Sequence, residues 1–228
     1  MAAESAQTYW DAFYSSNPRV QTLRSESPFA RWTNEQLGSV DRVLDFGCGT
    51  GRDSIYFAKA GYAVTGFDFS SAALQVARHE RDASGVSASF VFLDLRDSAA
   101  ALSTVRHLEA RNENLACYAR FLLHAIGDTE RRVLFAIVRS LLAGGGSLFL
   151  EFRTPADATT GHVFGETHFR NYLDPETVCE ELEELGAEIS VCQQGRGLAR
   201  FNGEDPAVCR VVASWNAPSS SQPGTLHP

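Results

Sequence analysis

The stretch RVLDFGCGTGRDS, residues 42–54, holds the pattern Asp-x-Gly-x-Gly-x-Gly, formed by Asp45, Gly47, Gly49 and Gly51. The residues before the pattern are largely apolar, as in a buried strand, and those after it are typical of a helix. A glycine-rich loop between a strand and a helix lets the backbone approach a ligand closely, and such loops hold nucleotide cofactors. The stretch therefore predicts a cofactor site.

Three carboxylates follow or end apolar runs and indicate which cofactor this is. Asp45 lies two residues before the first glycine, where it can anchor an ammonium group directly or through water and would repel a pyrophosphate. Asp68 ends the next apolar run and is placed to accept from ribose hydroxyls. Asp94 ends the third run, where an adenine amine can donate to it, although the cap of a following helix is an alternative role. Together they favour an adenosine-containing cofactor with a cationic end.

The glycine spacing disfavours a dinucleotide. The dinucleotide fingerprint Gly-x-Gly-x-x-Gly would place its third glycine at Arg52, whereas glycine comes one residue early, at Gly51. An arginine at that position would crowd the helix against the strand. An NAD-dependent oxidoreductase therefore remains only as an alternative.

Residues 43–51 resemble motif I of the class I S-adenosylmethionine-dependent methyltransferases, and FDFSSAAL and FLDLRD resemble the second and third cofactor segments of that superfamily. The resemblance covers about residues 40–216 and implies S-adenosylmethionine as the cofactor. Phe69 and Leu95 are expected to wall the adenine, with a core position as the alternative. The expected cofactor-binding residues are Asp45, Gly47, Gly49, Gly51, Arg52, Asp68, Phe69, Ser70, Asp94, Leu95 and Arg120.

The elements that must position these residues alternate along the chain. Strands are expected at 42–46, 62–68, 87–94, 114–119 and 146–152, and helices at 53–61, 70–84, 98–107, 129–145 and 174–187. The last two strands, 187–195 and 207–215, have no helix between them and are expected to form an antiparallel hairpin. The expected fold is α/β and doubly wound, with a mostly parallel seven-stranded sheet of the Rossmann-like methyltransferase type and an antiparallel last strand.

The chain is expected to divide into an N-terminal helical lid, residues 1–40, a catalytic domain, residues 41–216, and a disordered Pro/Ser-rich tail, residues 217–228. Aromatic residues at helical spacing near the N-terminus favour a lid that closes over the cofactor and excludes water. A helix packed on the core is the alternative. Tyr14 and Arg31 are the expected contributors of the lid to the site.

The acceptor is expected at the carboxyl ends of the strands, in the loops after the fourth and fifth strands. Arginines and histidines gather there in an otherwise acidic protein, which suggests an anionic acceptor. A structural network is the alternative, in which Arg153 and Arg170 pair with Glu151, Glu166 or Asp174. Arg200, near the last hairpin, is a further candidate. The expected catalytic residues are Tyr14, Arg120, His124, Arg153, His168 and Arg170.

The chain also resembles a narrower group of bacterial methyltransferases, which includes the phosphonate O-methyltransferase of dehydrophos biosynthesis. The segments that carry this resemblance are YWDxFY, SPFARW, RFLLHAI, EFRT and HFR. This resemblance implies O-methylation of a small anionic metabolite such as a phosphonate, in antibiotic biosynthesis. A carboxylate or phosphonate is already ionised and needs no base, whereas a hydroxyl or phenol acceptor would need His124 or His168. A non-catalytic S-adenosylmethionine-binding module is the third alternative, disfavoured by the polar loops.

The composition excludes several other classes of function. The 228 residues carry a net charge of −8, which disfavours a nucleic-acid partner because phosphates would be repelled over most of the surface. No apolar run is long enough for a membrane span and no secretion signal is visible, so a cytoplasmic protein without a membrane partner is expected. The five cysteines show no metal-ligand spacing, and no metal is expected. The oligomeric state is left open.

Overall fold

The structure is a computed structural model that describes residues 3–16, 25–109, 113–158, 171–201 and 203–216. Its centre is a seven-stranded sheet in the order β3-β2-β1-β4-β5-β7-β6. The strands are β1 Arg42–Phe46, β2 Ala63–Asp68, β3 Ala88–Phe92, β4 Leu115–Arg120, β5 Gly146–Arg153, β6 Glu188–Gly195 and β7 Val208–Trp215. The first five strands in this order, β3, β2, β1, β4 and β5, run parallel to one another. Strand β7 runs antiparallel to both β5 and β6. The predicted fold class, including the antiparallel last strand, is confirmed.

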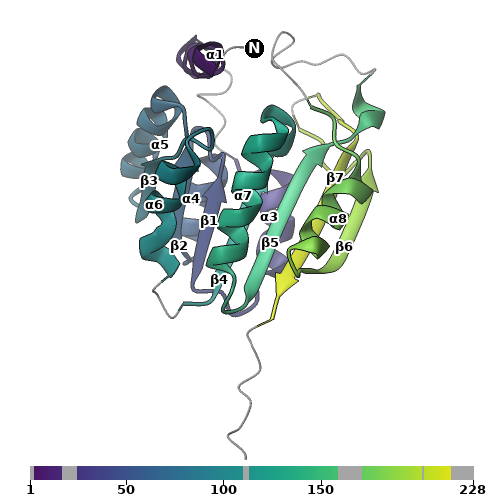
Figure 1. The fold of residues 1–228 in the computed structure, drawn as a ribbon. Helices are drawn as coiled ribbons and strands as arrows, with labels where there is room; N and C mark the ends of the chain where they lie inside the picture. Colours follow the sequence, from purple (N-terminus) through teal and green to yellow (C-terminus); the bar gives the residue numbers. More distant parts are fainter. Residues whose placement is uncertain (1–2, 17–24, 110–112, 159–170, 202, 217–228) are drawn as a thin grey trace, which may run out of the picture.

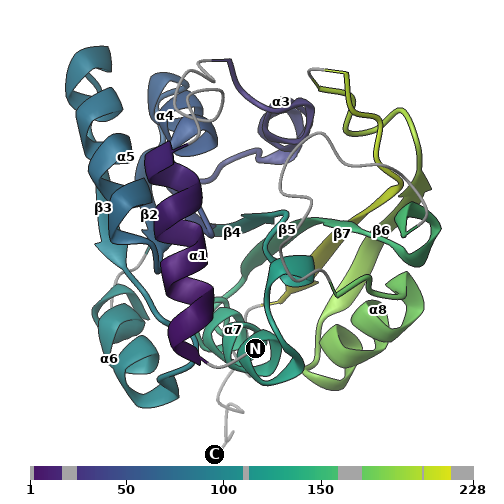
Figure 2. The ribbon, with the colours of Figure 1, turned by 90° about the horizontal axis from the view of Figure 1, so that it is seen from above.

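Helices cover both faces of the sheet, as the view from above shows (Figure 2). One face carries α3 Pro28–Gln36, α4 Arg52–Lys59 and α5 Ser71–Ser84, and the other carries α6 Ser98–Glu109, α7 Asp128–Leu141 and α8 Pro175–Glu184. The parallel strands are therefore buried on both faces. Successive residues of a strand point to opposite faces, so Val43 packs in one core and Leu44 in the other.

Helix α3 belongs to the core, because its first turn is fixed by buried contacts. Ser27 is its N-cap: the Ser27 Oγ accepts from the amide of Ala30 at 2.9 Å and donates to Oδ2 of Asp53 at 2.7 Å. The ring of Phe29 is fully buried and stacks on Tyr118 of β4, with 5.0 Å between ring centroids. Part of the expected N-terminal lid therefore packs as a layer on the sheet.

Helix α1, Ala3–Ser16, takes a different position, above the carboxyl ends of the central strands (Figures 1 and 2). It is joined to the start of α5 through Asp11, whose Oδ1 accepts from the Ser70 hydroxyl at 2.6 Å and from the Ala72 amide at 3.3 Å. This is the place where a cover would lie. That α1 opens and closes stays a prediction.

Some sequence-based expectations fall on parts of the chain that the structure does not describe. The expected tail at 217–228 is one, and two expected catalytic residues, His168 and Arg170, are others. Within the described ranges, no helix has the length and apolar character needed to cross a membrane. In the same ranges, no group of three or more His, Cys, Asp or Glu side chains is arranged so that it could hold a metal ion.

Candidate functional site

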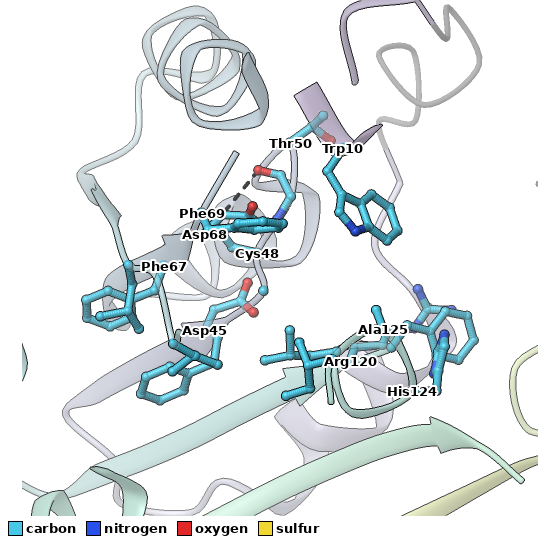
Figure 3. A pocket seen from close by; sticks show the side chains of 18 of the residues that line it. Trp10, Asp45, Cys48, Thr50, Phe67, Asp68, Phe69, Arg120, His124 and Ala125 are labelled. Carbon is cyan, nitrogen blue, oxygen red and sulfur yellow. Dashed lines mark hydrogen bonds between the residues drawn. The ribbon is translucent and has the colours of Figure 1, made fainter. Parts of the chain in front are cut away.

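A cavity of about 560 Å³ opens at the carboxyl ends of the strands, beneath α1 (Figure 3). Its walls come from the loops after β1, β2, β3 and β4, from α1, and from the connection between β6 and β7. Most of the expected site residues line it, namely Tyr14, Asp45, Gly47, Gly49, Arg52, Asp68, Phe69, Asp94, Leu95, Arg120, His124 and Arg153. The topology thus brings together residues from both halves of the chain.

The amides of the glycine loop are already used within the protein. Gly47 and Cys48 both donate to the carbonyl of Phe67, at 2.8 and 3.0 Å, and Gly49 donates to Oδ2 of Asp68 at 2.8 Å. A pyrophosphate bound at such a loop needs free backbone amides. The loop is therefore unsuited to a dinucleotide, in agreement with the interpretation of its glycine spacing.

Gly51 has a structural role beneath the loop and does not line the cavity. It caps α4 with a φ of 78°, in the left-handed region. A Cβ at this position would come within 2.8 Å of the Phe90 ring and 2.9 Å of the Ala77 Cβ. In a dinucleotide fold, the glycine that allows this close packing stands one residue later, at the position of Arg52. Here Gly51 allows it instead. Arg52 can therefore line the cavity.

The carboxylate of Asp45 is buried and directed into the cavity (Figure 3). Burial, with the neighbouring carboxylates Asp53 and Asp68, raises its pKa to about 7, against the hydrogen bond from Ser54, which lowers it. The hydroxyl of Ser54 donates to Oδ2 at 2.6 Å. A carboxylate with this surplus of negative neighbours favours a bound cation, and an ammonium group fits that requirement.

Asp68 is held by two backbone amides and covered by α1. Its Oδ1 accepts from Ser70 at 2.9 Å and its Oδ2 accepts from Gly49, so each oxygen keeps a lone pair for a further donor. Burial raises the pKa of Asp68 to about 6. Tyr14 lies against Gly49, and its pKa is raised by burial and by Asp68, so it stays a neutral phenol. Ser70, an expected cofactor residue, is buried as the N-cap of α5 and does not line the cavity.

Asp94 forms an ion pair with Arg96 rather than a helix cap. Arg96 donates through Nη2 to Oδ2 at 2.6 Å and through Nε to Oδ1 at 2.8 Å, and these bonds lower the pKa of Asp94. The guanidinium of Arg96 lies over the Phe69 ring, 5.4 Å from its centroid. The start of α6 is capped by Asp97, which accepts from the Ala100 amide at 3.0 Å. Asp97 therefore caps the helix, which was the alternative role considered for Asp94. The contact of Asp94 with an adenine stays a prediction.

Arg120 is fixed at the opposite side of the cavity from Asp68 (Figure 3). Its Nε donates at 2.9 Å to Glu151, a fully buried carboxylate whose other oxygen accepts from Nε of Arg210 at 2.9 Å. In the described part of the chain, neither Nη group of Arg120 has a hydrogen-bond acceptor. Arg120 therefore presents two donors to the cavity from a rigid position.

Phe121 follows Arg120 and was not predicted as a site residue. Its φ of 57° is unfavourable for a bulky side chain, and such strain collects at functional sites. The centroid of its ring lies 4.0 Å from Cζ of Arg120 and 5.2 Å from Cζ of Arg153. Nothing in its sequence context signals this role, because an aromatic residue after a strand usually belongs to the core.

Arg153 is part of an ion-pair network that differs from the expected one. It pairs with Asp157 at 2.6 Å and with Glu204 at 2.9 Å, whereas Glu151, an expected partner, binds Arg120 and Arg210 instead. Sequence reasoning missed Glu204 altogether.

Glu204 and Phe201 flank a tight turn at which their backbones exchange two hydrogen bonds of 3.0 Å. Both side chains line the cavity, and Arg52 lies over the Phe201 ring at 4.9 Å. The turn sequence Phe-Asn-Gly-Glu carries the signal that could have found this wall, because Asn-Gly favours two-residue hairpin turns.

His124 has one ring nitrogen in contact with the backbone of β5. It is buried, and its Nδ1 accepts from the Arg153 amide in a long contact of 3.4 Å. A neutral ring that accepts at Nδ1 carries its proton on Nε2. Arg200, the further candidate, is exposed and bound to Asp205 at 3.0 Å, outside the cavity wall.

Comparison with known proteins places this site in a family context. A model for the methyltransferase domain matches residues 43–146. The ubiquinone biosynthesis O-methyltransferase of Xanthomonas axonopodis pv. citri (strain 306) is 30% identical over 201 residues, which cover 81% of this chain and 77% of that protein. A relative from Geobacillus sp. (strain WCH70), named as a methyltransferase, is 26% identical over 155 residues, 64% of this chain and 59% of the relative.

Solved structures agree on the fold. An S-adenosylmethionine-dependent methyltransferase from Anabaena variabilis superposes with a TM-score of 0.67 at 17% identity, over 96% of each chain. The glycopeptide N-methyltransferase MtfA complexed with S-adenosylmethionine superposes with a TM-score of 0.60 at 18% identity, over 86% of this chain and 96% of that one.

Proposed function

This chain belongs to the class I S-adenosylmethionine-dependent methyltransferases, and from this premise we propose that it methylates an oxygen atom of a small anionic acceptor. When bound, S-adenosylmethionine supplies a methyl group carried on a sulfonium. Its chemistry fits the residues of the cavity. Asp45 offers a carboxylate to an ammonium group, Asp68 keeps acceptors for ribose hydroxyls, and the Phe69 ring with Arg96 forms a flat wall.

The proposed anionic acceptor is argued from the hydrogen bonds of Arg120. Glu151 accepts from its Nε, which fixes the guanidinium, and among the described residues no acceptor binds either Nη group, so both can donate to a ligand. Two parallel donors of this kind match a carboxylate or a phosphonate in a bidentate pair. Arg153 also lies against the Phe121 ring and adds a second positive charge. The rings of Phe121 and Phe201 limit the space, which favours a small acceptor.

An ionised acceptor needs no base, which agrees with a His124 whose Nδ1 is already in contact with the Arg153 amide. A carboxylate or phosphonate oxygen is nucleophilic without proton removal, so positioning is the main task of the protein. The arginines orient the anion, and the aromatic side chains of α1 that line the cavity exclude water from it. A phosphonate of natural-product biosynthesis, made in an antibiotic pathway, is the acceptor that the narrower sequence resemblance favours.

A hydroxyl acceptor is the second candidate, favoured by the name of the relative from Xanthomonas, a ubiquinone biosynthesis O-methyltransferase. This reaction would need a base at the acceptor end of the cavity. A neutral His124 with its proton on Nε2 would have to rotate before it could remove a proton.

The test is a comparison of acceptors and of two arginine variants. The parent enzyme, supplied with S-adenosylmethionine, is assayed on small phosphonates, carboxylates and phenols. Arg120→Ala should raise the KM of an anionic acceptor roughly tenfold to a hundredfold, since a hydrogen bond to a charged group contributes about 1.5–3 kcal/mol. Arg200→Ala is the matched control, because Arg200 is exposed and lies outside the cavity wall.

Three results would count against the proposal. Faster methylation of phenols than of anions by the parent would favour the hydroxyl acceptor. An unchanged acceptor KM in Arg120→Ala would remove Arg120 from acceptor binding. A weaker affinity for S-adenosylmethionine in that variant, measured by calorimetry, would assign Arg120 to the cofactor instead.

A further inference from the structure

Three charged side chains stand in one row across neighbouring strands, next to the cavity. Glu151 of β5 pairs in register with Arg120 of β4 on one side and with Arg210 of β7 on the other. Each oxygen of the Glu151 carboxylate accepts from one arginine: Oε1 from Nε of Arg120 and Oε2 from Nε of Arg210, both at 2.9 Å. Of these three residues, only Arg120 lines the cavity.

Arg210 is held in its position by contacts with two further segments. Its Nη2 donates at 2.6 Å to the carbonyl of Leu198, in the connection between β6 and β7. Its Cζ lies 5.3 Å from the ring centroid of Phe29 and 5.1 Å from that of Trp32, both in α3. The side chains of Arg210 and Glu151 are 6% and 0% exposed. Water therefore does not readily replace a lost partner of either side chain.

We infer that Arg210 is a positioning residue for the acceptor site, because it occupies the carboxylate oxygen of Glu151 that would otherwise bind an Nη group of Arg120. A carboxylate binds an arginine strongly through two parallel hydrogen bonds. With Arg210 on one oxygen, Glu151 holds Arg120 through Nε alone, and the Nη groups can donate into the cavity. This inference rests on the proposed function, in which Arg120 binds an anionic acceptor.

Loss of Arg210 should therefore weaken the binding of an anion at Arg120. Without Arg210, Oε2 of Glu151 is a buried acceptor that has lost its donor, and such a group is unfavourable. The carboxylate recovers a second hydrogen bond by pairing with an Nη group of Arg120, which removes that donor from the cavity. The row also changes from two arginines and one glutamate to one of each, so its net positive charge disappears and an anion is attracted less.

Calorimetry with methylphosphonate tests this inference on the full chain, saturated with S-adenosylhomocysteine so that no methyl transfer takes place. Arg210→Met keeps the length of the side chain and should weaken methylphosphonate binding roughly tenfold or more, as for a lost hydrogen bond to a charged group. Arg131→Met is the matched control. Arg131 is also a buried arginine, paired with Glu181 at 2.7 Å, and it lies outside the cavity wall. Equal binding by Arg210→Met and the control would overturn the inference.

A double variant, Arg210→Met with Glu151→Gln, separates this mechanism from a general loss of structure. Glutamine has no charge with which to compete for the Nη groups of Arg120, so the double variant should bind methylphosphonate within about threefold of the parent. A purely structural role of the row predicts the opposite, since the double variant has lost more native contacts. Weaker binding by the double variant than by Arg210→Met would overturn the inference. If Arg210→Met shows no cooperative thermal transition, the double variant alone decides, and weak binding by it overturns the inference.

A crystal structure of Arg210→Met gives a readout that needs no ligand. Glu151 is expected to bind Arg120 through both Nε and an Nη group, and a carboxylate that still contacts Nε alone would overturn the inference. The proposed function fails separately, either if the parent does not bind methylphosphonate or if Arg120→Ala binds it as tightly as the parent. In both of those cases the crystal structure still decides whether Arg210 keeps the Nη groups of Arg120 available.

Discussion

The carboxylate of Glu204 lies 2.9 Å from Nη2 of Arg153, at the wall of the cavity. Asp157 binds Nη1 of the same guanidinium at 2.6 Å and also lies 3.8 Å from Arg196. An anionic acceptor that binds Arg153 must compete with Glu204, the less buried of the two carboxylates. If the acceptor is an anion, as proposed, we expect Glu204 to lower its affinity.

Replacing Glu204 with glutamine should strengthen the binding of an anionic acceptor. Glu204→Gln keeps the shape of the side chain and removes its charge, so we expect the acceptor KM to fall about fivefold to tenfold, on the order of 1 kcal/mol. Steady-state kinetics with the best anionic substrate measures this. Glu180→Gln, at an exposed position of α8, is the matched control. A rise in KM would mean that Glu204 helps to bind the acceptor.

The affinity for S-adenosylmethionine should increase as the pH rises from 5 to 8. Burial raises the pKa of Asp45 to about 7 from its ordinary value of 3.8, so below pH 7 the carboxyl is protonated and attracts an ammonium group weakly. Calorimetry in buffers of different ionisation enthalpy should show proton release on binding near pH 6. Asp45→Asn should lose both the pH dependence and the proton release, whereas an unchanged profile would assign them to another group.

The cofactor-free protein should show the opposite trend in stability. A carboxyl group whose pKa is higher in the folded state stabilises the fold at acid pH, and that contribution is lost as the pH rises through the folded pKa. The contributions of Asp45, with a pKa of about 7, and Asp68, with a pKa of about 6, are therefore full below the ordinary pKa of 3.8 and are lost as the pH rises through 6 and 7. Thermal unfolding of Asp45→Asn should depend less on pH between 5 and 7 than that of the parent.

Asp68 should contribute to cofactor affinity and to loop stability together. Asp68→Ala removes the acceptor for the Gly49 and Ser70 amides, so we expect a tenfold or greater loss of cofactor affinity and a lower melting temperature. Asp82→Ala, an exposed position of α5, should change neither quantity. Unchanged cofactor binding in Asp68→Ala would contradict the role of Asp68 as the ribose acceptor.

The N-terminal segment should divide into a removable helix and an indispensable one. Deletion of residues 1–20 removes α1 and should leave a cooperative thermal transition with weaker cofactor binding, because α3 and its cap are intact. Phe29→Ala in the full chain should cost about 3–5 kcal/mol of unfolding free energy, since the ring is fully buried against Tyr118. Loss of the transition on deletion of α1 would show that α1 is part of the core.

Local patterns in the sequence were sufficient for the fold class and for the prediction that Asp45, Asp68 and Asp94 meet at one edge of the sheet. Apolar runs of strand and helix length alternate through the chain, and parallel strands of such a unit end at one edge of the sheet. Asp45, Asp68 and Asp94 each stand at or beside a strand end, so their meeting in one cavity follows from the topology. The order of residues along a short segment was enough for these inferences because strands and helices have fixed periods.

The arrangement of Arg153, Glu204 and Phe121 at the cavity was decided by tertiary structure. Whether Arg153 pairs with Glu204 or with Glu151 depends on distances of a few ångströms between β5 and a distant turn, and ion pairing depends steeply on such distances. The position of α3 also depends on tertiary structure. Its apolar side chains are compatible with a lid or with a core, and only their packing against the sheet shows that they belong to the core. Phe121 adopts its left-handed backbone because the surrounding contacts impose it, against its own preference. Local sequence patterns report only on residues that are close together in the chain. These features are set by packing between segments that are far apart in the chain.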